Sequence, residues 1–245
     1  MIKTRNYKHM NNTITCSSCS NENPSYVHIC ENCNSFIRER VYNIDLWDLI
    51  GLLIESPGKA FKHIVYSEHK NFIGFVLFLI TVKFLVDARF VSLVSLGSFN
   101  PATALYLSYS IVLVSLTVFL ILYSYCFTLV NEFLNIKTRF RDNFSVLVYS
   151  LIPNVFGIVF LFVIELVVFG EYLFSINPSP FVVKEFVAYL LAGAELSLII
   201  WSVFLSYIAF RVQTNSMLLS IINTLVFNIF IAALLFFSSK YIFTL

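Results

Sequence analysis

Residues 105–130 read LYLSYSIVLVSLTVFLILYSYCFTLV, which is 26 residues without one charged side chain. An α-helix rises about 1.5 Å per residue, so about 20 apolar residues are enough to cross the hydrocarbon core of a bilayer. The stretch exceeds that length. We therefore predict a transmembrane helix here and an integral membrane protein as a whole.

Similar apolar stretches lie on both sides of this segment. They cover residues 71–95, 144–169, 186–210 and 216–237, and the connections at 97–101, 131–143, 170–180 and 211–215 carry helix breakers and polar residues. The sequence thus predicts an all-α polytopic membrane protein with five transmembrane helices in residues 71–245. Because five is an odd number, the two termini are expected on opposite sides of the membrane.

The composition supports the same class of protein. Of the 245 residues, 58% are hydrophobic and only 12% are charged, against about 25% charged in an ordinary soluble domain. A soluble globular enzyme is therefore excluded. Half of the 30 charged residues lie in residues 1–70, which indicates a polar head before a membrane body. A net charge of +2 is too small to indicate nucleic acid as a partner.

The distribution of cations predicts the orientation, since Lys and Arg are retained on the cytoplasmic side. With the N-terminus inside, twelve cations are on the inner side and three on the outer side, and Lys83 lies within the first span. The inner cations are eight in residues 1–70 with Lys137, Arg139, Arg141 and Arg211; the outer ones are Arg89, Lys184 and Lys240. We expect a cytoplasmic N-terminus and an external C-terminus.

Residues 41–70 connect the head to the first predicted span. Apolar residues recur at helical spacing between residues 44 and 66, and Ser56 and Pro57 suit the N-cap and first position of a second helix. One interpretation is a pair of amphipathic helices in the inner interface, with Trp47 at headgroup depth. The alternative, a cytoplasmic collar packed against the spans, remains open.

Four of the five cysteines form two CxxC pairs in the head, residues 1–40. Cys16 and Cys19 are separated by ten residues from Cys30 and Cys33. Two such pairs can close a thiolate tetrahedron around zinc, which supplies folding energy that so small a module lacks. A cytoplasmic head disfavours the rival interpretation, disulfides or a redox CxxC. We expect structural zinc in a ribbon that serves as a docking module, and we expect Cys126 to be a buried packing residue.

The membrane body lacks the usual catalytic signatures. All four histidines precede residue 71, no serine lies in a GxSxG motif, and the seven glycines form neither a P-loop nor a dinucleotide fingerprint. The protein is therefore predicted not to be an enzyme.

A few polar residues within the predicted spans are candidates for an intramembrane site: Lys83, Glu195, Asn223 and Asn228. Lys83 and Glu195 lie about 18 Å and about 22 Å from the inner ends of their spans. We predict that they form a pair near the midplane, although Lys83 could instead pair with Asp87, four residues away. These residues could equally serve interhelical packing alone. We expect Glu165 to reach the outer interface.

Several short motifs resemble the Yip family of five-span membrane proteins, named for interacting with Ypt/Rab GTPases. They are residues 55–61 (ESPGKAF), residues 149–153 (YSLIP) and Trp201. With an N-terminal zinc ribbon, the chain is similar to the prokaryotic branch. The resemblance implies no enzymatic activity, no Rab partner and no assigned partner-binding residue.

These features favour a membrane-organising or partner-recruiting adaptor in a prokaryotic cytoplasmic membrane. Its expected partners are the lipid bilayer and an unidentified cytoplasmic protein, and a homo-oligomer remains open. The alternative is a small transporter or channel with a polar midplane site.

Overall fold

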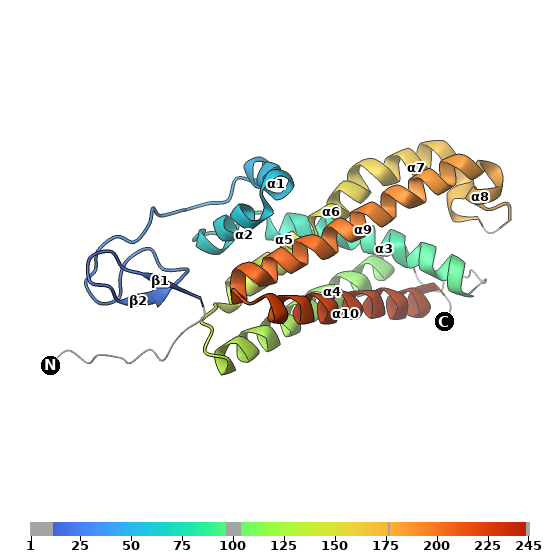
Figure 1. The fold of residues 1–245 in the computed structure, drawn as a ribbon. Helices are drawn as coiled ribbons and strands as arrows, with labels where there is room; N and C mark the ends of the chain where they lie inside the picture. The colour runs from blue at the N-terminus through green and yellow to red at the C-terminus, as the bar shows by residue number, and fades with distance from the viewer. Residues whose placement is uncertain (1–11, 97–103, 176, 244–245) are drawn as a thin grey trace. The chain divides into compact units, whose positions relative to one another are not determined.

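The computed structural model describes residues 12–96, 104–175 and 177–243 (Figure 1). The predicted loop at 97–101 lies outside these residues. The chain forms two compact units, each assembled from three separate stretches. Unit 1 comprises Met1–Phe72, Ile121–Leu147 and Ser206–Thr224, and unit 2 comprises Ile73–Leu120, Val148–Leu205 and Leu225–Leu245.

Unit 1 begins with a small antiparallel hairpin. Strand β1 (Thr13–Thr15) pairs with β2 (Glu22–Pro24), and Ile14 is opposite Asn23. A second, shorter pairing joins Ile29 to Phe36. Each pairing closes around one CxxC motif, as expected for a ribbon of two hairpins. Asn23 and Pro24 both belong to β2.

Two short amphipathic helices follow, as predicted. Helix α1 (Leu46–Glu55) starts at Asp45, whose Oδ1 accepts hydrogen bonds from the backbone N–H groups of residues 47 and 48 at 2.9 and 3.2 Å. Helix α2 (Pro57–Tyr66) starts with Ser56 at the N-cap and Pro57 at the first position, although the Ser56 side chain makes no capping bond. The buried side chains recur at helical spacing: Leu49, Leu53, Ala60, Phe61, Ile64 and Val65. α1 and α2 pack on each other, and Trp47 is 81% exposed.

The rest of the chain is almost entirely helical. The elements are α3 (Ile73–Leu96), α4 (Leu105–Phe133), α5 (Phe140–Ser150), α6 (Ile152–Phe156), η1 (Gly157–Leu161), α7 (Phe162–Phe169), η2 (Gly170–Phe174), α8 (Pro180–Val183), α9 (Glu185–Thr214) and α10 (Met217–Phe243). Four helical segments among the described residues are long and apolar enough to cross a membrane. They are Leu105–Phe133, Phe140–Phe174, Glu185–Thr214 and Met217–Phe243.

Helix α3 corresponds to the first of the five predicted spans, and its three charged residues lie close together near the middle of the helix. Its 24 residues would extend about 36 Å. They include Lys83, Asp87 and Arg89, whereas Leu105–Phe133 carries only one charged residue, Glu132. The helical, membrane-protein fold class is therefore confirmed by four segments, and a fifth span is not among them.

The third predicted span is one continuous apolar run but not one continuous α-helix. It breaks at Leu151, because Pro153 has no N–H to donate to the preceding turn, and α6 begins at Ile152. A π-helical turn, η1, then separates α6 from α7. Such turns are often found at functional sites.

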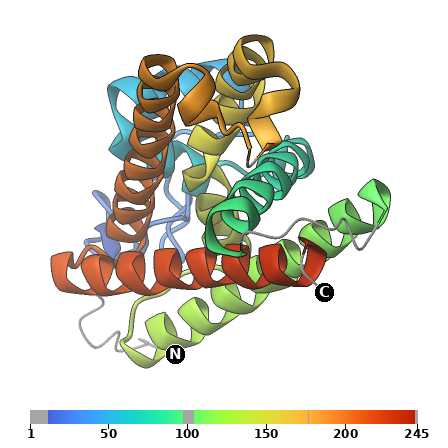
Figure 2. The same cartoon turned by 90° about the vertical axis from the view of Figure 1, so that its right-hand side faces the viewer.

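The core of unit 2 forms where η1, α7 and η2 meet the first half of α9. Its buried residues are Leu161, Phe169, Leu173, Ala188 and Leu191, with Phe90 of α3 packed against them. Figures 1 and 2 show these segments side by side in both views. The ring centroids of Phe90 and Phe174 are 5.3 Å apart. This packing holds α3 against the broken helix.

Large apolar side chains are exposed along the long helices, for example Leu122 and Phe133 on α4, Ile200 on α9 and Phe237 on α10. Soluble proteins rarely expose apolar patches that extend along whole helices. In a bilayer these side chains contact lipid, so their exposure agrees with the composition of the helices.

Candidate metal centre and buried polar cluster

The four cysteines of the head converge on one point. The Sγ atoms of Cys16, Cys19, Cys30 and Cys33 all lie within 4.8 Å of one another. The pairs Cys16–Cys33 and Cys19–Cys30 are each separated by 3.6 Å. Zinc–sulfur bonds of about 2.3 Å in a tetrahedron place the sulfurs about 3.8 Å apart. The cluster therefore has dimensions suited to a metal ion.

The distances between the Sγ atoms also argue against disulfide bonds within the cluster. A disulfide requires about 2.0 Å between the sulfurs, and all five cysteines are free thiols. Cys126, which we expected to be buried, is exposed on α4. Helical periodicity alone does not reveal which face of a membrane helix meets lipid and which meets protein.

The two CxxC segments share one backbone geometry. In the first, Ser20 N–H donates to Cys16 O at 2.9 Å; in the second, Asn34 N–H donates to Cys30 O at 3.1 Å. Ser20 and Asn34 have φ values of 55° and 57°, a left-handed conformation that Asn tolerates better than most residues. Each segment is thus a tight local turn that aims both of its thiols in one direction.

Two side chains outside the CxxC motifs support the cysteines. The Ser35 hydroxyl lies 3.1 Å from Cys16 Sγ and 3.0 Å from Cys33 Sγ, and it lowers the pKa of the Cys16 thiol to about 6. The buried Asn23 accepts from Glu31 N–H at 3.0 Å and donates to Cys30 Sγ at 3.5 Å. Hydrogen bonds to ligand atoms orient the ligands and tune the metal. The CxxC motif does not indicate that Ser35 and Asn23 contact the cysteine sulfurs, so neither contact was predicted.

In unit 2, Lys83 joins two carboxylates. Its Nζ lies 2.5 Å from Asp87 Oδ1 and 2.8 Å from Glu195 Oε1, and its side chain is 2% exposed. The predicted contact between Lys83 and Glu195 is therefore present. The alternative contact, between Lys83 and Asp87, is present as well. A buried ammonium is tolerated only when it is paired and hydrogen-bonded, and here α3 and α9 each supply a partner.

Gly157, the first residue of η1, makes room for this lysine. A Cβ added at Gly157 would lie 2.6 Å from Cε of Lys83, closer than two carbon atoms can approach. The Lys83 ammonium is held by two carboxylates and cannot easily withdraw. Nothing in the sequence marks Gly157, since Lys83, the residue for which it makes room, is distant along the chain.

Glu165 is not at an outer interface, and our expectation was wrong. Its side chain on α7 is 6% exposed, and Oε2 is buried without a hydrogen-bond partner. It interacts electrostatically with Glu195, Lys83 and Asp87. The carboxyl groups of Asp87, Glu165 and Glu195 therefore all lie near the ammonium group of Lys83. The third apolar run is broken before Glu165, so the position of this residue in the sequence does not predict where its side chain lies.

The two asparagines of the predicted site have other surroundings. Asn223 belongs to unit 1, where its Nδ2 donates to Leu219 O at 2.7 Å and its backbone carbonyl accepts from Tyr123 OH at 3.0 Å. Asn228 lies on the part of α10 in unit 2, half-buried. The neighbouring hydroxyls of Ser220 and Thr224 donate to backbone carbonyls four residues earlier, and Ser220 Oγ also lies 3.1 Å from Thr214 Oγ1 at the end of α9. This pattern agrees with the packing interpretation of the stripe on α10.

A further buried ion pair in unit 1 was not predicted. Asp142, 1% exposed, lies 3.0 Å from Lys70 Nζ and accepts from Arg139 Nε at 2.7 Å. Burial lowers the pKa of Lys70, and Asp142 partly offsets this effect. Lys70 and Asp142 are too far apart in the chain for spacing to indicate that they pair. It secures the end of α2 to the start of α5.

No protein-family model, no curated protein and no solved structure matches the chain.

Proposed function

We propose that the protein is a membrane-anchored adaptor whose metal-binding head docks a cytoplasmic partner. The observation that carries the proposal is the four-cysteine cluster of the head. All four ligand positions of a tetrahedral zinc would come from the chain, which leaves no open position for a substrate. A closed site of this kind stabilises a module and leaves its surface for recognition.

The topology that goes with this function has five spans, with the N-terminus inside the cell. In addition to the four long apolar segments, α3 can cross a bilayer by its length, and Lys83 and Asp87 neutralise each other within it. Asn12→Cys and Leu245→Cys variants in a cysteine-free background test the topology. An impermeant thiol reagent applied to sealed cells should label only residue 245; equal labelling of both would contradict an odd number of spans.

The adaptor itself is tested by crosslinking in intact cells, followed by identification of the proteins bound to the head. A Cys16→Ser/Cys19→Ser variant should lose these partners, because two ligands of the metal are removed. Cys126→Ser, which alters a cysteine outside the cluster, is the matched control and should retain them. The same partners captured by all three proteins would contradict docking through the head.

We also infer that the chain is a prokaryotic relative of the Yip family. The supporting residues are the motif at 55–61, which spans the junction of α1 and α2, and the YSLIP motif, which lies where the third apolar run breaks. A structure of a Yip-family protein with its break at the equivalent proline would support the relationship. A continuous helix there would contradict it.

The cluster around Lys83 favours a second candidate, a small transporter or channel. One ammonium and three carboxyl groups lie together in an apolar bundle, and intramembrane ionisable residues commonly mark ion pathways. Cation flux into proteoliposomes, compared between the wild type and Glu195→Gln, tests this function. Flux that Glu195→Gln abolishes would establish transport, and equal leakage through both proteins would exclude it.

A further inference from the structure

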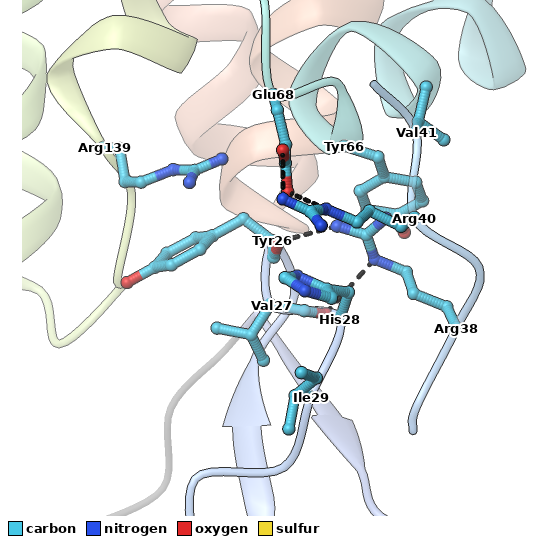
Figure 3. Close-up of a pocket in the computed structure, with 10 residues that line it drawn as sticks. All are labelled: Tyr26, Val27, His28, Ile29, Arg38, Arg40, Val41, Tyr66, Glu68 and Arg139. Atoms are coloured by element: carbon cyan, nitrogen blue, oxygen red, sulfur yellow. Dashed lines mark hydrogen bonds and ion pairs between the residues drawn. The ribbon is translucent and has the colours of Figure 1, made fainter. Parts of the chain in front are cut away.

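A pocket of about 270 Å³ lies in unit 1 between the metal-binding head and the segment after α2 (Figure 3). One wall is the head segment Tyr26 to Ile29, and another is the linker that contains Arg38 and Arg40. The linker is held in place, since Val41 bridges to Ser67 and its carbonyl accepts from Glu68 N–H at 2.9 Å. The pocket therefore has walls fixed by backbone contacts.

Cations dominate the lining. It contains Arg38, Arg40 and Arg139, with Glu68 as its one carboxylate. Glu68 is already neutralised, because Arg40 donates to both of its oxygens, at 2.6 and 2.8 Å, and holds the pKa of Glu68 below its usual range. Two further guanidinium groups face the pocket. Arg139 has its carboxylate partner, Asp142, outside the lining, and Arg38 donates to backbone carbonyls.

Aromatic rings orient these two guanidinium groups. Arg38 stacks over Tyr66 with 3.9 Å between Cζ and the ring centroid, and Arg139 stacks over Tyr26 at 4.4 Å. Stacking covers the face of a guanidinium and leaves its in-plane N–H groups available for anions. Arg38 donates to three backbone carbonyls, from Nη2 to Tyr26 O at 2.6 Å and from Nε and Nη1 to Val27 O and Glu39 O at 3.2 Å each. It therefore braces the wall of the pocket and reaches an anion through the second hydrogen of Nη1 or Nη2.

Arg139 has one nitrogen, Nη1, that is available to donate to a ligand. It uses Nε for Asp142 and Nη2 for Val65 O, and Nη1 donates no hydrogen bond within the described part of the chain. Its side chain is 45% exposed. In Figure 3 the Arg139 guanidinium extends toward Arg40 and Glu68. Burial, and after it the like charge of Arg139, lower the pKa of Arg38, so an anion between them would relieve their repulsion.

The position along the chain indicates which anion this pocket meets. Arg139 immediately precedes Phe140, the first residue of a segment long enough to cross a membrane. The pocket is therefore close to the level at which lipid phosphates lie. Arginine forks match the oxygens of phosphate in pairs. Pockets for drug-sized ligands start at about 300 Å³, so this volume suits a small headgroup.

We propose that this pocket binds a phosphate group, presented either by a lipid headgroup or by a small soluble phosphate, through Arg139 and Arg38. This binding goes beyond the adaptor function and does not require it. Full-length protein in neutral-detergent micelles is titrated by calorimetry with inorganic phosphate and, separately, with short-chain phosphatidic acid. Both probes should bind the wild type. Tighter binding of phosphatidic acid identifies a lipid source, and equal binding identifies a soluble phosphate.

The deciding variant is Arg139→Gln, which should weaken binding by about tenfold or more, as expected for loss of a charge-assisted hydrogen bond. Lys62→Gln is the control, because Lys62 is an exposed cation on α2 that does not line the pocket. It should weaken binding by about twofold or less, the effect of one surface charge. No binding by the wild type, or equal losses in the two variants, would overturn the proposal.

A separate measurement guards against misfolding of the variant. Zinc content and the thermal unfolding midpoint of Arg139→Gln are compared with those of the wild type. If they fall, Arg139→Lys replaces it, since lysine keeps the charge opposite Asp142 but lacks the planar fork. Arg139→Lys should bind both probes several-fold more weakly than the wild type. Wild-type affinity in this variant would overturn the proposal.

Discussion

The four-cysteine cluster and the Lys83 cluster are both convergent polar sites, but their members are collected in opposite ways. Cys16 and Cys33 are 17 residues apart, and each CxxC turn orients its own thiols by local hydrogen bonds. Lys83 and Glu195 are 112 residues apart and meet only because α3 and α9 belong to one packed unit. A local site can be read from residue spacing, whereas a long-range site depends on how helices pack.

The two sites also differ in what would stabilise them. Four thiolates repel one another unless a cation neutralises them, so we expect the head to require a bound metal for folding. Lys83 already has carboxylate partners from two helices, so its cluster is satisfied in part by the chain itself. Glu165 is the exception, because its buried Oε2 has no hydrogen-bond partner. Removing a component should therefore unfold the head but only destabilise the bundle.

The largest effect is expected from removing the metal. Binding of a structural zinc contributes on the order of 10 kcal/mol or more to a small module, so chelation or Cys16→Ser/Cys33→Ser should unfold residues 13–36 and leave the bundle helical. Metal analysis should give close to one zinc per chain for the wild type and for Cys126→Ser. Limited proteolysis reports the folding of the head. A head that resists proteolysis without metal under reducing conditions would contradict the prediction.

The next effect concerns the bundle. Lys83→Met leaves Asp87 and Glu195 without their shared partner, and breaking a buried pair costs about 3–5 kcal/mol. Denaturant unfolding in micelles, followed by circular dichroism, measures the loss. Lys184→Met, which alters an exposed lysine on another segment, should cost about 1 kcal/mol or less.

A double-mutant cycle then isolates the contact between the two helices. Lys83→Met with Glu195→Gln should recover part of the loss, with a coupling of about 1 kcal/mol or more. Additivity within about 0.5 kcal/mol would show that Glu195 contributes nothing and that Lys83 is held by Asp87 alone.

Gly157→Ala tests whether the cluster depends on close packing. The added methyl group would contact Cε of Lys83, and overpacking typically costs about 1–3 kcal/mol. The same unfolding assay applies. Gly193→Ala on α9 is the control, because a Cβ there meets no atom within 4 Å, and alanine favours a helix over glycine. Equal stability of the two variants would show that Lys83 adjusts without cost.

A smaller effect is expected at the supporting serine of the head. Ser35→Ala removes a hydroxyl that lies within hydrogen-bond distance of Cys16 and Cys33, and loss of such a supporting contact lowers metal affinity about 10-fold to about 100-fold. Competition with a chromophoric chelator measures the affinity. Ser17→Ala alters an exposed serine within the first CxxC and should leave the affinity unchanged. An unchanged affinity for Ser35→Ala would assign the hydroxyl no role.

The smallest effect concerns pH. Burial lowers the pKa of His63, so folding disfavours its protonated form. Its contribution to stability is complete above the unfolded pKa of about 6.5 and is lost as the pH falls below that value and through the lower pKa of the folded state. The thermal unfolding midpoint of the wild type should therefore fall between about pH 7.5 and about pH 5.5, and it should fall more than that of His63→Gln. Parallel pH profiles would show that His63 is not involved.

The sequence alone determined the class of the fold and the position of the four-cysteine cluster. Apolar length identifies membrane-crossing helices whatever their packing, because the bilayer sets that length, and α4, α9 and α10 begin within two residues of the predicted positions. The CxxC spacing located all four thiols for a similar reason. A tight turn joins residues three apart, so little remains for tertiary structure to decide.

Only the tertiary structure decided which polar side chains meet inside the bundle. The third apolar run looks uniform in sequence, yet Pro153 breaks it and the π-helical turn directs Glu165 toward the Lys83 cluster. Gly157 matters because of a lysine 74 positions earlier in the chain, and Cys126 is exposed because of the face on which it lies. Such contacts follow from the relative rotation of packed helices, which periodicity within one helix does not specify.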